Sequence, residues 1–120
     1  FGNIELKKAA IVADAGKIID PKGLISQLEG GFIQSASWTM LEEVNFDEHE
    51  IYSTDWDKYP ILSFKDIPKI ETFLIDRPCE PSLGSGEATQ GPTAGAIGNA
   101  IFNAIGVRAK KIPFTIENIS

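Results

Sequence analysis

Apolar residues recur every four positions along the segment that follows Pro21. The repeat comprises Leu24, Leu28, Phe32, Ala36 and Met40. This spacing places apolar side chains on one face of a helix. Asp20 suits the N-cap position, and Pro21 suits the first helical position, where a missing N–H costs nothing. The pattern therefore predicts a helix of about 20 residues with one wide apolar stripe.

Runs of β-branched and small apolar residues predict strands on either side of this helix. The first strand covers residues 4–14, with residues 17–20 as a candidate extension. A second covers 69–75, where apolar and polar residues alternate at the period of a strand. Between helix and second strand, residues 42–62 read as strand, acidic turn and strand, followed by a loop that Pro60 closes.

A second helix is predicted after Pro92, ending at Gly106, which suits the position just past a helix C-terminus. Its expected apolar face comprises Ala96, Ile97, Ala100, Ile101, Ala104 and Ile105. Ile112 and Phe114 are the expected anchors of the tail that follows. The order strand, helix, strands, loop, helix indicates an α+β fold, with a small mixed sheet packed against two main helices.

Length and charge limit the classes of function. The chain of 120 residues is long enough for one domain, and its net charge of −6 argues against a general nucleic-acid binder. No apolar run approaches the roughly 20 residues that span a bilayer. Cys79 is the only cysteine, which excludes an internal disulfide. His49 lies in an acidic stretch and reads as a solvated turn residue, so no metal ligand set or catalytic triad is expected.

Two adjacent glycines, Gly30 and Gly31, stand in the middle of the first predicted helix. Each is expected to cost the helix roughly 1 kcal/mol relative to alanine. One explanation is that another helix or strand packs closely there. The other is the close approach of a ligand, with Gln27 one turn earlier as a polar contact.

A glycine-rich loop, residues 84–91, carries one acid, Glu87. The glycine spacing fits neither a P-loop nor a dinucleotide-binding turn, and no lysine follows before Lys110. A carboxylate acts as a general base at neutral pH when its surroundings, most simply burial, favour its protonated form. From composition alone Glu87 is either such a base or an ordinary charge on a linker.

Four stretches, in order, resemble the C-terminal end of the molybdenum-binding large subunit of the xanthine dehydrogenase and aldehyde oxidase family. The chain is most similar to the isoquinoline 1-oxidoreductase type. The stretches are VADAGKIIDPKGLISQLEGGFIQSAS, LEEVNF, STDWDKYPIL and GSGEATQGPTAGAIGNAIFNAIGVRAKKIPF. Together they cover nearly the whole chain, so residues 1–120 are expected to form a single C-terminal subdomain of the cofactor-binding domain.

The resemblance implies a hydroxylase that oxidises N-heterocycles or aldehydes with oxygen from water. Its cofactor would be molybdopterin with molybdenum, in the cytosine dinucleotide form. Glu87 matches the active-site base that deprotonates the metal-bound hydroxyl, and Gln27 matches a glutamine that hydrogen-bonds the pterin. Gly30, Gly31 and Gly86 would then lie close to the cofactor, and the pterin rather than the protein would supply the metal ligands.

The same resemblance implies partners. These are the remainder of the large subunit, an iron–sulfur electron-transfer subunit or domain, and a small heterocycle or aldehyde; no nucleic acid and no membrane span are expected. Because only part of the site is present, the isolated chain is expected to be inactive and to hold no cofactor. The alternative is a non-catalytic α+β domain of related fold that packs against or binds a partner.

Overall fold

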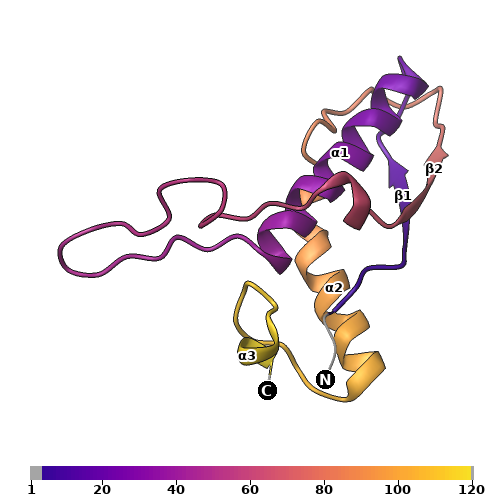
Figure 1. Cartoon of the computed structure of the whole chain (residues 1–120). Coiled ribbons are helices and arrows are strands. Elements are labelled where there is room, and N and C mark those ends of the chain that lie inside the picture. The colour runs from indigo at the N-terminus through magenta and orange to yellow at the C-terminus, as the bar shows by residue number, and fades with distance from the viewer. Residues whose placement is uncertain (1–3, 120) are drawn as a thin grey trace.

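Two parallel strands and two long helices form the body of the protein (Figure 1). The computed structural model describes residues 4–119. Its elements in chain order are β1 (Lys8–Asp14), α1 (Pro21–Met40), the 3-10 helix η1 (Phe64–Asp66), β2 (Lys69–Ile75), α2 (Gln90–Ile105) and α3 (Ile116–Ile119). The α+β class that the sequence predicts is confirmed.

The sheet consists of β1 and β2, which pair in parallel from Lys8 opposite Lys69 to Asp14 opposite Ile75. Parallel neighbours need a crossover connection, and α1 provides it, packing against both β2 and α2. The predicted second strand has the predicted bounds, 69–75. Within residues 4–119 the sheet is parallel only, so the expected mixed sheet does not form.

The predicted apolar stripe of α1 is the centre of the core. Asp20 caps the helix by accepting a hydrogen bond from the Lys22 backbone N–H (3.1 Å), as the sequence predicts. The buried stripe packs with residues of β1, α2 and the C-terminal segment; the core comprises Ile11, Ala15, Leu24, Leu28, Phe32, Ala36, Met40, Ile97, Ile101, Phe114 and Ile119. Each large apolar side chain buried there contributes roughly 1.5–3 kcal/mol.

The first strand starts at Lys8 instead of residue 4, and it ends at Asp14 without the extension. The Asp14 carboxylate accepts a hydrogen bond from the Gly16 backbone N–H (3.0 Å), and Gly16 adopts a left-handed φ of 67°. A Cβ at Gly16 would lie 2.0 Å from the Pro81 carbonyl oxygen. This tight glycine turn ends the strand, so the extension through residues 17–20 is wrong.

The second helix ends as predicted but is covered on only part of its apolar face. Gly106 follows it with a left-handed φ of 74°, and its N–H donates to the Phe102 carbonyl oxygen (2.8 Å). The helix starts at Gln90, so Pro92 lies in its first turn instead of before it. The buried residues are Thr93, Ile97 and Ile101, and the exposed ones include Ala96, Ala100, Ala104 and Ile105.

Of the two residues predicted to anchor the tail, Phe114 does so and Ile112 does not. Phe114 is buried, with 7% of its surface exposed, and its N–H donates to the Thr39 carbonyl oxygen at the end of α1 (2.7 Å). Ile112 is 53% exposed, because the chain turns back to α1 only after it.

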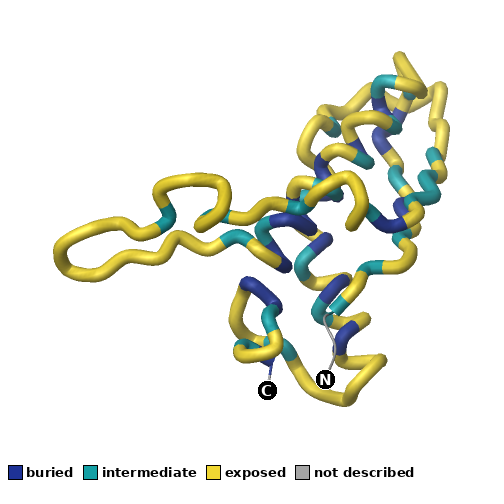
Figure 2. Tube along the Cα trace, viewed as in Figure 1, coloured by how far each residue is buried: buried dark blue, intermediate teal, exposed yellow. Residues whose placement is uncertain are grey.

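Residues 42–62 form an exposed excursion from the body, which we call the acidic arm (Figures 1 and 2). The two strands predicted there do not form; a single antiparallel bridge joins Phe46 and Ile51. An isolated pair of strands is at best marginally stable without a third strand or a helix to cover it. Hydrogen bonds hold the base instead, from Tyr59 to Glu42 (2.8 Å) and from Leu62 N–H to the Ser37 hydroxyl (2.8 Å).

The tip of the acidic arm is organised by the carboxylate of Asp47. This group accepts hydrogen bonds from the backbone N–H groups of His49 (2.8 Å) and Glu50 (3.0 Å) and from the Tyr52 hydroxyl. These bonds, the Tyr52 bond foremost, lower the pKa of Asp47 from its ordinary value. His49 is exposed here, which confirms the solvated turn histidine.

The arm tip is expected to be ordered at neutral pH and to lose order below about pH 4. A depressed carboxylate pKa contributes stability above its unfolded value, and that stability disappears as the pH falls through the folded value. NMR titration of the His49 and Glu50 amides should show a midpoint below that of an unperturbed aspartate. Asp47→Asn should abolish this pH-dependent transition, and the control Asp57→Asn should leave it unchanged. A midpoint at or above the ordinary pKa of aspartate would contradict the expectation.

Candidate functional site

The exposed side of α1 meets the glycine-rich loop at Gln27. The Gln27 side-chain amide donates a hydrogen bond to the Gly86 carbonyl oxygen (3.4 Å), across 59 residues of sequence. A Cβ at Gly86 would lie at an ordinary contact distance, 3.5 Å, from the same amide nitrogen. Glu87 follows directly. The fold therefore brings the predicted cofactor contact on α1 next to the predicted base.

A second hydrogen bond, between two side-chain amides, joins α1 to the start of α2 further along the helix. The Gln90 side chain donates to the Gln34 side-chain oxygen (2.8 Å), linking the first residue of α2 to α1. Gln27 and Gln34 are seven residues apart, so they share one face of α1, and Gly30 and Gly31 lie between them on that face. Thr89 and Gln90 are absent from the site residues that the sequence predicts. The sequence signals for this contact are the seven-residue spacing of the two glutamines on α1 and the two glycines between them.

The two glycines of α1 have different surroundings. A Cβ at Gly31 would lie 2.6 Å from the Thr89 hydroxyl oxygen, which is buried and donates to the Leu28 carbonyl oxygen (2.8 Å). Gly31 therefore allows α2 to approach α1. Beyond the neighbouring backbone of α1 itself, a Cβ at Gly30 would meet no atom of the described chain within 4 Å. Close helix packing explains Gly31, and the exposed backbone at Gly30 leaves room for the close approach of a ligand.

Glu87 lies in the turn formed by residues 86–89, just before α2. Its side chain is exposed, and within residues 4–119 its carboxylate makes no ion pair or hydrogen bond. The turn itself is held by the backbone, since the Gln90 N–H donates to the Glu87 carbonyl oxygen (3.3 Å). The carboxylate is thus presented outward from a turn whose backbone is anchored to α2.

Residues 4–119 contain no cluster of three or more His, Cys, Asp or Glu side chains that could hold a metal ion. In the same part of the chain, no helix is long and apolar enough to cross a bilayer.

Comparison with known proteins identifies the fold and the family. Residues 1–68 match the model of the molybdopterin cofactor-binding domain. The chain belongs to this family. The matched region contains Gln27 and both glycines of α1, and it ends before the loop that carries Glu87.

Individual members of the family resemble nearly the whole chain. A nicotinate dehydrogenase subunit of Pseudomonas putida is 40% identical over 118 residues, which cover 98% of this chain and 10% of that protein. The aldehyde oxidoreductase molybdenum-binding subunit of Escherichia coli K12 is 29% identical, over 98% of this chain and 17% of that protein. The solved structure of quinoline 2-oxidoreductase from Pseudomonas putida 86 has a TM-score of 0.84 at 26% identity, covering 95% of this chain and 16% of that one.

Proposed function

We propose that this molybdopterin cofactor-binding domain is the C-terminal subdomain of the large subunit of a molybdenum hydroxylase. In this proposal it supplies the active-site base, Glu87, and one wall of the pterin site. The observation that carries the proposal is the hydrogen bond from the Gln27 side chain to the Gly86 carbonyl oxygen, because it places the two predicted contacts side by side.

The residues where α1 meets the glycine-rich loop and the start of α2 fit a pterin. A pterin ring presents amide-like donors and acceptors along its edges, and the side-chain amides of Gln27, Gln34 and Gln90 offer complementary groups. Gly30 and Gly86 are exposed and carry no side chain, so a flat ring system can approach the backbone closely. When bound, the cofactor supplies the molybdenum redox chemistry and activates the oxygen that comes from water.

Glu87 is proposed to accept the proton that leaves as that oxygen attacks the substrate carbon. A positioned carboxylate removes such a proton at one of its two oxygens. In the isolated fold this side chain faces solvent, and we propose that the remainder of the large subunit encloses it. Exclusion of water would strengthen its interaction with the reacting groups.

For the substrate we propose an N-heterocycle, in an enzyme of the isoquinoline 1-oxidoreductase type. Two relatives support this choice, since nicotinate and quinoline, the compounds after which those proteins are named, are both N-heterocycles. An aldehyde is the second substrate class to test, because an aldehyde oxidoreductase subunit also covers 98% of the chain. The cytosine dinucleotide form of the cofactor and an iron–sulfur partner belong to the same proposal.

Replacing Gln27 by Ala in the complete enzyme is expected to reduce the retained cofactor about tenfold, since it removes one polar contact to the pterin worth roughly 1.5 kcal/mol. Molybdenum analysis and pterin fluorescence of the purified enzyme measure this directly. Ser26→Ala, a change at the neighbouring exposed position of α1, is the matched control and should leave both values unchanged. Wild-type cofactor content in the Gln27→Ala enzyme would show that Gln27 does not help to hold the pterin.

A further inference from the structure

One edge of β1 has no hydrogen-bonding partner among residues 4–119. The Lys69 N–H donates to the Lys7 carbonyl oxygen (3.2 Å), so Lys7 points its backbone toward β2. Backbone groups alternate sides along a strand, and the odd-numbered residues of β1 therefore face β2. The N–H and C=O groups of Ala10 and Val12 point the other way, where the described chain offers them no partner.

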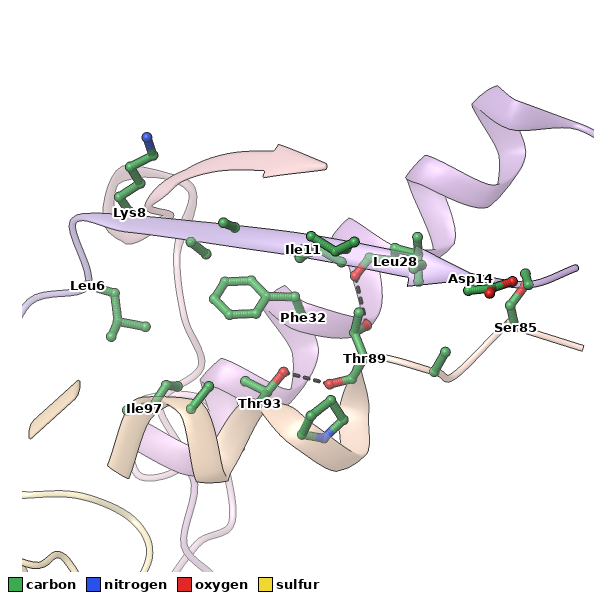
Figure 3. Close-up of a pocket in the computed structure, with 18 of the residues that line it drawn as sticks. Leu6, Lys8, Ile11, Asp14, Leu28, Phe32, Ser85, Thr89, Thr93 and Ile97 are labelled. Atoms are coloured by element: carbon green, nitrogen blue, oxygen red, sulfur yellow. Dashed lines mark hydrogen bonds between the residues drawn. The ribbon is translucent and has the colours of Figure 1, made fainter. Parts of the chain in front are cut away.

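An apolar cleft of about 640 Å³ follows this free edge (Figure 3). Figure 3 shows β1 along one side of the cleft, α2 along the other, and Phe32 of α1 between them; Leu28 of α1 also lines the cleft. The exposed Ala96 and Ala100 of α2 belong to the lining. These are residues of the predicted apolar face of α2 that the rest of the described chain leaves uncovered.

Charges occur only at the two ends of this edge, and each is already paired. Lys8 forms an ion pair with Glu71 (2.8 Å), and Asp14 forms one with Arg77 (2.7 Å). Between them lie only alanine, isoleucine and valine side chains, in residues 9–13. The cleft therefore suits an uncharged, apolar segment of about the length of β1.

The outer face of the sheet is also uncovered. Val12 is 65% exposed, Phe73 opposite it is 55% exposed, and Ile75 is 45% exposed. All-parallel sheets in proteins are covered on both faces, and an unpaired flat edge is a template for another strand. A two-stranded parallel sheet with an exposed apolar face and an unpaired edge is thus typical of one part of a larger sheet.

We propose that a β-strand from the remainder of the same large subunit pairs with the free edge of β1 and fills the cleft. A strand adds at about 4.8 Å from its neighbour, and backbone pairing would satisfy Ala10 and Val12 together. The same fold occurs with a TM-score of 0.84 inside a chain of which it makes up 16%, so such a segment would be tethered to the site. The inference rests on the proposal that this chain is part of a longer subunit, and it is independent of the role of Glu87.

Hydrogen exchange of the full-length subunit, resolved to single residues, tests the pairing. We expect the Ala10 and Val12 amides to exchange within about tenfold of the Ile11 and Ala13 amides, which face β2. Exchange as fast as that of Glu48 in the acidic arm would overturn the proposal. So would protection that appears only as subunit concentration rises, because it would assign the edge to a second copy. Glu87→Gln should not alter the result, so a failed catalytic role and a failed strand pairing are distinguishable.

Proline at Val12 gives a second test in the same subunit. Proline removes the Val12 N–H, which β2 does not use, and an edge strand facing water tolerates this. If a strand is paired there, Val12→Pro should shorten the half-life of the folded subunit under protease by about tenfold or more. Val12→Ala, which keeps the N–H, is the control. Equal half-lives for the two variants would overturn the proposal, even if exchange at Ala10 is slow.

Discussion

Replacing Glu87 by Gln in the complete enzyme is expected to lower kcat by a factor of about 10²–10⁴, the usual contribution of a general base. Glutamine keeps the size and shape of the side chain and cannot accept the proton. Molybdenum content should stay at the wild-type level, because the carboxylate makes no ion pair or hydrogen bond within residues 4–119 and the turn is held by its backbone. Steady-state kinetics at saturating substrate and metal analysis of the same preparation give both values.

Glu80→Gln is the matched control for this experiment, since Glu80 is an exposed acid in the same connection between β2 and α2. Its kcat should remain within about twofold of wild type, because surface substitutions away from a site have small effects. A Glu87→Gln enzyme with kcat within a few-fold of wild type would show that Glu87 is a solvated loop residue. The non-catalytic alternative would then be favoured.

Alanine at the two glycines of α1 is expected to act in opposite directions. Gly31→Ala should lower the free energy of unfolding by about 1–2 kcal/mol, because the new methyl group would displace the buried Thr89 hydroxyl from its bond to the Leu28 carbonyl. Gly30→Ala meets no atom within 4 Å beyond the neighbouring backbone of α1, so it should gain helix propensity and raise that free energy by up to about 1 kcal/mol. Urea unfolding of the two variants measures both changes.

A double-mutant cycle separates packing from propensity at Gly31. Thr89→Ala removes the oxygen that the new methyl group would displace, and it also removes one hydrogen bond. In that background Gly31→Ala should lose most of its destabilising effect, giving a coupling of at least about 0.5 kcal/mol between the two sites. Additive effects would mean that the glycine serves some purpose other than the approach of α2.

The elements that the sequence predicts correctly are those whose signals are local. The apolar stripe and the Asp20 cap determine α1 with its bounds, and Gly106 determines the end of α2. These features need only neighbouring residues, because a cap or a left-handed glycine satisfies the backbone within one turn. The alternation of apolar and polar residues over 69–75 is likewise a local signal, and it predicts β2 with its observed bounds.

The larger errors arise where the structure of a segment depends on residues far away in the sequence. Phe46 and Ile51 carry the composition of strands, but nothing in the described chain covers them, so the acidic arm keeps one bridge instead of a hairpin. The role of Gly31 depends on Thr89, 58 positions later, which no local pattern reveals. For the candidate site, spacing identifies unusual glycines and a lone acid. The hydrogen bond between Gln27 and Gly86 is visible only in the fold.

The closed base of the acidic arm has an evolutionary consequence. Glu42 and Tyr59 meet there, and Leu62 is bonded back to Ser37, so the arm leaves and re-enters the body at one place. The entropy of closing a loop grows only slowly with its length. Lineages are therefore free to lengthen, shorten or replace the arm without disturbing α1 or the sheet. We expect this segment to accumulate insertions and deletions fastest when homologous sequences diverge, and to accept a grafted reporter peptide for the same reason.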